Sequence, residues 1–538
     1  MGWKEIMIDE KNFKLSSKRL SSEDRKKALG NYFDHLETQS RHFLGYQNVQ
    51  TLNYENDIKK FLNFHINNIG DPFVSGNYTP NSKAIERAVL DYYAKLWNAK
   101  TPHDVQDPES YWGYTLTMGS TEGNLYGIWN ARDYLAGKKL LIDSRNKHKT
   151  RKYRSKYIHA LPEEGNPNAY TPVAFFSEDT HYSIIKAMRV LQIPTFYDIG
   201  KKFYPSQNPL NSTGEWTKEF SEVPSLNGKE GPGAIDIEKL VILVEFFASR
   251  GYPILICCNY GTTFKGAYDD VKTIGEKLMP IFKKYGLINR EIIYDEEGHS
   301  DVRNGYWIHV DGALGASYMP FIEMAYKQGK IESCGSIFDF RLPWVNSIVT
   351  SGHKWIGTPF PCGLFMTKVK YQLFPPDAPE YIGSPDTTFA GSRNGLSPVI
   401  LWDFLAQNSY EDLINRAVRC ENLASYTEEQ LKTVQEYHPE IDLWIERTPL
   451  ALTVRFRKPN DQIVYKHSLS CETLLIDDTE RHYAHIFTMD SVTKDVIDEF
   501  ISELKEPSAF PAEEKIVKIT IKKPQKATFL TERGRGWR

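Results

Sequence analysis

Between about residue 112 and residue 370, short apolar runs alternate with segments of helical periodicity, and this alternation constrains the fold most strongly. The strand-like runs are YWGYTLT, PVAFFS, PILICCNYG, YWIHVDGA and SIVTSG; helical patterns include GNLYGIWNARDYL, YSIIKAMRVLQ, VKTIGEKLMPIFKKYG and MPFIEMAYKQ. Such alternation predicts an α/β fold in which helices cover both faces of a mainly parallel sheet. Because ligands bind these sheets beyond the carboxyl ends of the strands, we expect the functional residues at that edge.

The segments outside this region divide the chain into further parts. Residues 1–100 are predicted to form an N-terminal helical and extended segment, with helical patterns in SSEDRKKALGNYFDHLETQ and SKAIERAVLDYYAKLWNA. Residues 101–415 form the predicted large α/β domain. Residues 416–510 form a small α+β domain, in which the alternating run LALTVRFRKP lies between two helical patterns. Residues 511–538 are a basic tail.

Two charged insertions interrupt the alternation. The stretch 137–168 is rich in lysine and arginine, and the stretch 285–306 is rich in aspartate and glutamate. We interpret the basic stretch as a solvated surface excursion, while a contact with an anion or a nucleic acid remains the alternative. The two stretches could also pair across a subunit contact.

Composition limits the kinds of partner. A net charge of −3 gives no strong overall field, so neither nucleic acid nor a membrane surface is expected as the main partner. No apolar run approaches the ~18 to 20 residues that span a bilayer. The six cysteines are sparse and form neither a CxxC pair nor a zinc-like cluster. We therefore predict a cytoplasmic protein with reduced, mostly buried cysteines and no metal site.

Charged residues follow two of the strand-like runs. In TSGHKWIG, the strand-like run SIVTSG is followed by His353 and then Lys354, and burying an amine there is costly unless the amine has a function. A neutral amine can form an imine with an aldehyde cofactor. In HVDGALG, Asp311 ends an apolar strand, where its carboxylate can keep a cofactor ring nitrogen protonated so that the ring accepts electrons. Taken singly, an exposed lysine at a strand end and a helix N-cap aspartate remain alternatives.

Two further motifs precede helices. In TMGSTEGNLYG, backbone N–H groups and the hydroxyls of Ser120 and Thr121 could cradle a phosphate, or form an ordinary capping box. The motif is neither GxGxxG nor a P-loop, so nucleotide binding is not favoured. In SEDTHYSIIKA, His181 could stack on a flat cofactor, or serve as a capping or core histidine. The four motifs occur in the order phosphate loop, His181, Asp311 and Lys354, and each follows a strand-like run. Such a combination rarely arises by chance.

On these motifs the chain resembles the group II decarboxylases of amino acids that depend on pyridoxal 5′-phosphate (PLP), which have the aspartate aminotransferase fold type I. The resemblance covers about residues 60–500 and rests on GSTEGN, DTHYS, NYGTTFKGAYDD, HVDGA, SGHKWIG and GSRNG. HINNIGDPF and YIGSPDTTFAGSRNG point to the branch of bacterial histidine decarboxylases and plant serine decarboxylases. The resemblance implies PLP as cofactor, a homodimer, and conversion of an L-amino acid to its amine and CO2.

The resemblance also implies residue roles. As catalytic residues, it implies Lys354 for the Schiff base with PLP, Asp311 for the pyridinium nitrogen, His181 for stacking on the ring and Tyr381 for protonating the substrate carbon. The other implied cofactor residues are Gly119, Ser120, Thr121, Thr262, Ala313, Ser351 and His353. The implied substrate residues are Asn77, Tyr78, Gly315, Ser392 and Arg393. Ser120 stands where the family pattern leads us to expect a second glycine.

Gly315 guides the expected substrate, because a small residue there could open room for an aromatic ring. We therefore expect L-tryptophan first, L-histidine close behind, and tyrosine or serine less. An aldehyde-forming or transaminating enzyme of the same fold is the first alternative. Tyr381 argues against aldehyde formation, and Arg393 is the candidate carboxylate clamp for a transaminase. A catalytically silent, anion-binding scaffold is the second alternative, against which the joint presence of Lys354, Asp311 and His181 argues.

Overall fold

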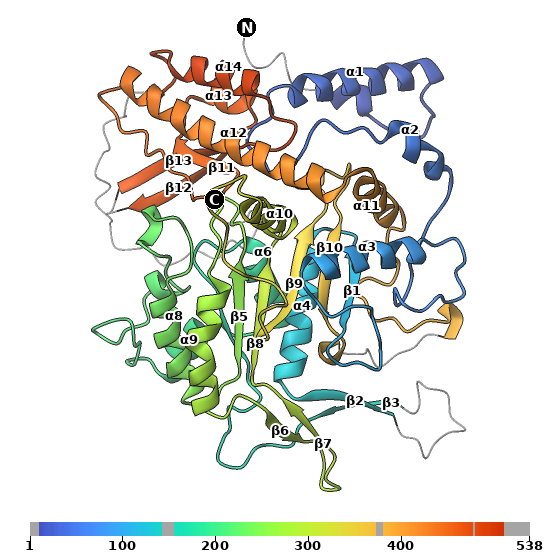
Figure 1. Ribbon diagram of the computed structural model, residues 1–538, viewed down its shortest axis with the longest axis vertical. Helices are drawn as coiled ribbons and strands as arrows, with labels where there is room; N and C mark the ends of the chain where they lie inside the picture. Colours follow the sequence, from blue (N-terminus) through green and yellow to red (C-terminus); the bar gives the residue numbers. More distant parts are fainter. Residues whose placement is uncertain (1–9, 143–154, 373–379, 477–478, 511–538) are drawn as a thin grey trace.

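The computed structural model describes residues 10–142, 155–372, 380–476 and 479–510, and its centre is a six-stranded sheet (Figure 1). The strand order is β1-β10-β9-β8-β5-β4. The strands are β1 (Tyr111–Leu116), β4 (Val173–Phe175), β5 (Ile254–Asn259), β8 (Tyr306–Asp311), β9 (Val345–Ser351) and β10 (Gly363–Lys368). β10 is antiparallel to both of its neighbours, and the other pairs are parallel. The predicted mainly parallel sheet is confirmed, although the sequence patterns did not identify β10.

Helices cover both faces of the sheet, as predicted. The large unit contains α3 (Lys83–Leu96), α4 (Ser120–Leu135), α6 (Tyr182–Leu191), α7 (Phe196–Phe203), α8 (Ile237–Ala248), α9 (Val271–Lys284), α10 (Gly315–Lys327) and α11 (Leu396–Gln407). Alternate residues of a strand point to opposite faces. Ile254 and Ile256 therefore join the core under α8, α9 and α10, whereas Leu255 and Cys257 pack with α4 and α6.

A second, smaller sheet forms its own core near the carboxyl terminus. Strands β11 (Thr453–Arg457), β12 (Ser470–Ile476) and β13 (Thr479–Phe487) pair antiparallel in the order β11-β13-β12, beside α12 (Tyr410–Tyr437), α13 (Asp461–Lys466) and α14 (Lys494–Leu504). The predicted boundary at 415/416 falls inside α12. This helix spans both units, because Leu413 joins the large core and Leu431 joins the small one.

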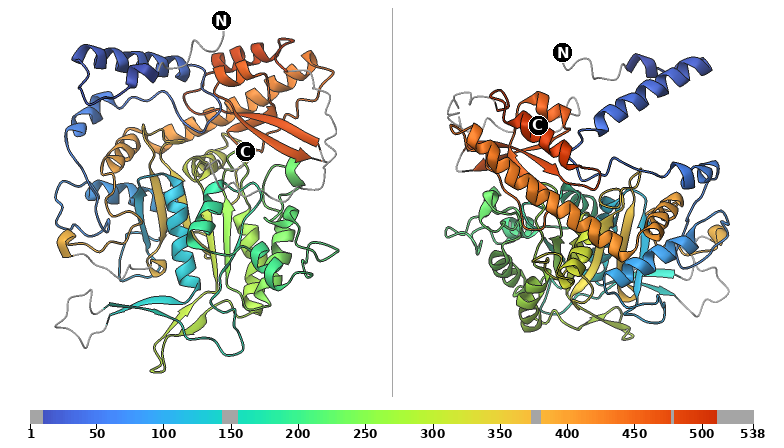
Figure 2. Two further views of the ribbon diagram at one scale, coloured as in Figure 1. Left: turned by 180° about the vertical axis from the view of Figure 1, so that it is seen from behind. Right: turned by 45° about the horizontal axis from the view of Figure 1, so that its top comes forward.

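The chain before α3 contacts both units, because Leu44 joins the small core and Val49 joins the large one. Helix α1 (Ser22–Ser40) begins as predicted at its cap Ser21, and α2 (Glu55–Ile58) follows it. Figure 2 shows α1 standing away from the body. Its apolar side chains are exposed on one stripe, formed by Leu29, Tyr32, Phe33 and Leu36. Short 3₁₀ helices occupy Glu10–Phe13, Lys59–Asn63, Lys218–Phe220, Gly228–Glu230, Val369–Tyr371 and Glu380–Ile382.

Both charged insertions contain hairpins that contact each other. β2 (Lys138–Ile142) pairs with β3 (Ser155–His159), and β6 (Arg290–Ile293) pairs with β7 (Ser300–Arg303). The hairpins lie at the same end of the molecule (Figure 1). Nζ of Lys139 lies 3.3 Å from a carboxylate oxygen of Asp301, so the insertions pair within one chain. Most of the basic run, 143–154, and the predicted tail, 511–538, lie outside the described residues.

The cysteines match the prediction. All six are free, and four of them, Cys257, Cys258, Cys362 and Cys420, are buried. Within the described ranges, no helix has both the length and the apolar composition required to cross a membrane.

Candidate active site

The four predicted motifs meet at one edge of the large sheet. Asp311 is the last residue of β8, and Lys354 lies in the turn that follows β9. His181 is the N-cap of α6, shortly after β4, and Gly119 is the N-cap of α4, shortly after β1. Because these four strands run in the same direction, their carboxyl ends lie at the same edge. This is where such sheets bind ligands.

Lys354 provides an amine suited to imine formation. Burial lowers the pKa of Lys354 to about 8, although the charge of Asp311 opposes this shift. Its amine makes no hydrogen bond or ion pair within the described part of the chain. A larger neutral fraction makes an amine more nucleophilic toward an aldehyde. The turn is anchored by Asn48, whose Nδ2 donates to the backbone oxygen of His353 at 2.9 Å, a contact with no signal in the sequence.

Asp311 is buried and held by two donors. Its Oδ1 accepts from the backbone N–H of Ala313 at 3.2 Å, and its Oδ2 accepts from Nδ2 of Asn124 at 2.8 Å. The carbonyl of Ala313 accepts from the backbone N–H of Ser351 at 3.0 Å, which ties the ends of β8 and β9 together. A carboxylate offers about four acceptor sites. Asp311 therefore retains capacity for a protonated ring nitrogen.

The loop before α4 closes on the turn after β9. Gly119 has a φ of 72°, and a Cβ added there would lie 2.5 Å from Cε1 of His353, so only glycine fits. The hydroxyls of Ser120 and Ser351 are 2.6 Å apart, and the backbone N–H of Ser120 donates to Ser351 Oγ at 3.2 Å. Thr121 is the next residue of α4. The uncapped helix start beside two hydroxyls fits a phosphate group.

His181 lies within electrostatic reach of both charged residues. Burial lowers the pKa of its imidazole, Asp311 raises it, and Lys354 lowers it again. Its Nδ1 lies 2.8 Å from Oγ of Ser183 and also accepts from the Ser183 backbone N–H at 3.3 Å. His181 therefore does cap α6, as the alternative interpretation expected. Its imidazole nevertheless lies close enough to Asp311 and Lys354 for their charges to affect its pKa.

Two predicted site residues, Thr262 and Gly315, have roles in backbone structure. Oγ1 of Thr262 accepts from the backbone N–H of Ala267 at 3.0 Å and so closes the turn after β5. A Cβ added at Gly315 would lie 2.3 Å from the backbone oxygen of Tyr260. Gly315 is therefore small because β5 approaches it closely. This contact alone accounts for a glycine at position 315, so its small size is no evidence of space for an aromatic ring.

Four other predicted residues lie on the loop segments 65–81 and 380–395. Tyr381 is 80% exposed, and Nδ2 of Asn77 donates to its backbone oxygen at 3.4 Å. The hydroxyls of Tyr78 and Ser392 bond to residues of the segment 65–67. In the part of the chain that the structure describes, no hydrogen bond or ion pair joins these four residues to the catalytic edge of the same chain.

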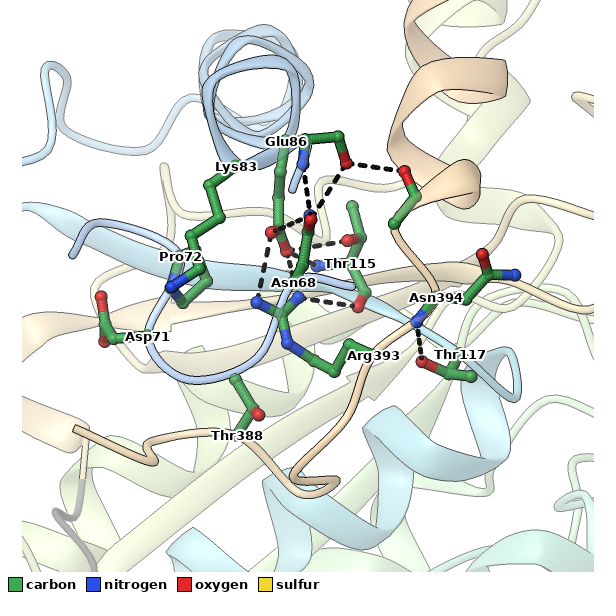
Figure 3. A network of polar contacts seen from close by, with 12 residues as sticks. Asn68, Asp71, Pro72, Lys83, Glu86, Thr115, Thr117, Thr388, Arg393 and Asn394 are labelled. Carbon is green, nitrogen blue, oxygen red and sulfur yellow. Dashed lines mark hydrogen bonds and ion pairs between the residues drawn. The ribbon is translucent and has the colours of Figure 1, made fainter. Parts of the chain in front are cut away.

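Arg393 forms a buried ion pair (Figure 3). Its guanidinium pairs with the carboxylate of Glu86, and the two side chains are 1% and 0% exposed. Arg393 Nη2 also donates to the backbone oxygen of Gly70 at 3.1 Å. Glu86 accepts in addition from Thr115 N–H at 2.9 Å and from Asn68 Nδ2 at 2.8 Å. Arg393 thus fixes its own loop to α3 and β1, which argues against its predicted role toward substrate and against a transaminase clamp.

Comparison with known proteins shows the family to which the chain belongs. Residues 229–446 match the family model of the pyridoxal-dependent decarboxylase conserved domain. Serine decarboxylase 3 of Oryza sativa subsp. japonica is 30% identical over 472 residues, which cover 87% of this chain and 78% of the relative. Histidine decarboxylase of Solanum lycopersicum is 28% identical over 477 residues, which cover 88% and 87%.

A solved structure extends the likeness to the whole fold. L-methionine decarboxylase from Streptomyces sp.590 superposes with a TM-score of 0.86 at 45% identity, covering 94% of this chain and 99% of that one. The resemblance therefore covers both units, and it confirms the PLP-dependent fold type I. The chain belongs to the group II PLP-dependent amino-acid decarboxylases, enzymes that release CO2 from an amino acid.

Proposed function

We propose that this enzyme decarboxylates L-methionine to 3-methylthiopropylamine and CO2. The 45% identity with the methionine enzyme over nearly the whole chain carries this proposal, since the serine and histidine enzymes share 28–30%. L-histidine is the second candidate, because of the tomato relative. L-tryptophan, the first expectation from sequence, loses its support, because Gly315 is small for a reason of backbone packing.

The proposed roles follow from the geometry of the catalytic edge. Lys354 would bind PLP covalently, and Ser120 and Ser351 would hold its phosphate at the start of α4. Asp311 would keep the pyridine nitrogen protonated, and His181 would cover one face of the ring. When bound, PLP supplies an electron sink for the bond between Cα and the carboxylate. The substrate loses CO2 from Cα, and Cα gains a proton.

Tyr381 is the proposed source of that proton, and it leads to a proposal about assembly. The side chain of Tyr381 is largely exposed, and within the described residues no hydrogen bond joins it to Lys354 of its own chain. We infer a homodimer in which this loop serves the active site of the partner. A monomer that is fully active at micromolar concentration would overturn this assembly.

The proposal is tested with a panel of L-amino acids, with detection of both amine and CO2. L-methionine should give the highest kcat/KM, L-histidine a lower value, and L-tryptophan little product. The visible absorbance band of the purified enzyme should be lost in Lys354→Ala. If another amino acid gave the highest kcat/KM, the substrate assignment would be wrong, but the assignment of the enzyme as a decarboxylase would still hold. Aldehyde as the main product would favour the aldehyde-forming alternative.

The predicted cytoplasmic location remains a proposal that rests on the sparse, free cysteines. Fractionation of the source cells, followed by immunodetection of the enzyme, would check it.

A further inference from the structure

Asn124 lies at the centre of a buried polar network that connects Asp311 with His181. Its Nδ2 donates to Oδ2 of Asp311 at 2.8 Å and to Oγ of Ser183 at 2.9 Å, and its Oδ1 lies 2.9 Å from Nε2 of His309. Asn124, Ser183 and His309 are each 0% exposed. None of these three residues has a role in the reaction described above.

The chemistry of the donors and acceptors fixes each hydrogen in this network. A carboxylate only accepts, so the amide of Asn124 must present its NH2 group to Asp311. The amide oxygen then faces His309, and His309 must donate to it from Nε2. A neutral imidazole with its hydrogen on Nε2 accepts at Nδ1.

The far end of the network agrees with this direction. The indole N–H of Trp307 can only donate, and it lies 3.1 Å from Oγ of Ser347. The hydroxyl hydrogen of Ser347 is therefore free to point at Nδ1 of His309, which is 2.8 Å away. Hydrogen bonds thus run one way, from Trp307 through Ser347 and His309 to Asn124.

The near end of the network determines the tautomer of His181. Oγ of Ser183 accepts from Asn124, so its own hydrogen is available for Nδ1 of His181, which lies 2.8 Å away. The backbone N–H of Ser183 also donates to Nδ1 at 3.3 Å. Two donors aimed at Nδ1 leave no room for a hydrogen there. The neutral imidazole of His181 therefore carries its hydrogen on Nε2.

We propose that Asn124 and His309 are positioning residues that orient the carboxylate of Asp311 and hold His181 as the Nε2–H tautomer. In that state His181 has no lone pair at Nε2. It therefore acts toward the substrate as a hydrogen-bond donor through Nε2 and does not act there as a base.

The surrounding charges are consistent with two neutral histidines. Burial lowers the pKa of His309 to about 4, although Asp311 opposes the shift. Around His181, burial lowers the pKa, Asp311 raises it, and Lys354 and Lys186 both lower it. A doubly protonated His181 would place a hydrogen on Nδ1 against two donors. Protonation should therefore disrupt the network as the pH falls.

The arm toward Asp311 is tested with Asn124→Leu in the full-length holoenzyme. Removing a hydrogen bond to a charged group should weaken PLP binding by about ten- to hundredfold. The visible band should move to shorter wavelength, because Asp311 holds the ring nitrogen less well. Asn130→Leu is the matched control, since Asn130 is a buried asparagine of the same helix outside the network. Equal PLP affinity and equal spectra in the two variants would overturn this arm.

The effect of the network on His181 is tested with Ser183→Ala, which deletes a single hydroxyl. This variant tests the proposal even if Asn124→Leu does not fold. Without this donor the pKa of His181 should rise, so the acidic limb of kcat/KM should move to higher pH by about half to one unit. An unchanged limb would overturn this arm.

A direct measurement needs neither cofactor nor turnover. Nitrogen-15 spectra of wild-type apoprotein labelled at histidine, compared with those of His181→Gln, assign the two nitrogens of His181. The proposal expects an unprotonated Nδ1 and a protonated Nε2. A hydrogen found on Nδ1 at neutral pH would overturn it.

Discussion

The candidate site has two halves that are built differently. The inner half lies at the sheet edge and consists of Gly119, Ser120, His181, Asp311, Ser351 and Lys354. The outer half lies on loops and consists of Asn77, Tyr78, Tyr381, Ser392 and Arg393. Strand ends in one sheet are fixed by backbone pairing, so a single chain assembles the inner half. The outer half is tied to the segment 65–81 and to Glu86, and within the described residues no hydrogen bond or ion pair joins it to Lys354.

The largest effect is expected in the inner half. Lys354→Ala removes the amine that binds PLP, and it should reduce kcat/KM by more than about a thousandfold, because the reacting groups are no longer held together. The visible absorbance band should vanish with the activity. Thermal unfolding of the apoprotein should stay near that of wild type, since the amine makes no hydrogen bond within the described residues. A persistent band at this position would mean that another lysine carries PLP.

The next largest effect tests whether the halves come from different subunits. Tyr381→Phe removes the proposed proton source and should lower the rate of amine formation by about a hundredfold or more, with PLP affinity unchanged. When the Lys354→Ala and Tyr381→Phe variants are co-expressed, each subunit should supply the residue that the other lacks. With random pairing, the co-expressed population should recover about one quarter of wild-type activity, because half of the dimers are mixed and each mixed dimer has one complete site of two. No recovery would place Tyr381 and Lys354 in the same chain's site.

The third effect concerns stability. Glu86→Gln leaves the Arg393 guanidinium buried without its charge partner, which typically costs about 3–5 kcal/mol in the free energy of unfolding. The double variant Glu86→Gln/Arg393→Met should lose less, because no uncompensated charge stays buried. Urea unfolding measures both. If Arg393 instead binds substrate, Arg393→Met would raise KM while stability stays constant.

The same contrast explains what the sequence could predict. Periodicity of 2 and 3.6 is local, so five of the six strands of the large sheet, several of the covering helices and the four motifs of the inner half were predictable. His309 was also within reach, because it precedes Asp311 by two residues of a strand and so shares its face. Asn124 lies four residues after Ser120, which places both on one side of α4.

Other features leave no local signal. Glu86 and Arg393 are 307 residues apart, and no pattern around either one indicates the other. A small residue such as Gly315 fits either an open pocket or a close backbone approach, and only the position of β5 decides between them. The boundary in α12 was misplaced because a continuous amphipathic helix gives no sign of the point where it passes from one core to the other.

The smallest effect concerns the pH dependence of cofactor attachment in the inner half. An amine attacks an aldehyde only in its neutral form, and burial lowers the pKa of Lys354 to about 8. As the pH rises toward 8 the neutral fraction grows, so PLP added to apoenzyme should attach faster up to about pH 8 and then level off. An exposed lysine would keep accelerating toward pH 10, near its ordinary pKa of about 10.4. Stopped-flow absorbance on apoenzyme measures the rate. In Asp311→Asn the carboxylate that stabilises the ammonium is absent, so the plateau should begin at lower pH. An unchanged plateau in that variant would mean that the charge of Asp311 does not reach Lys354.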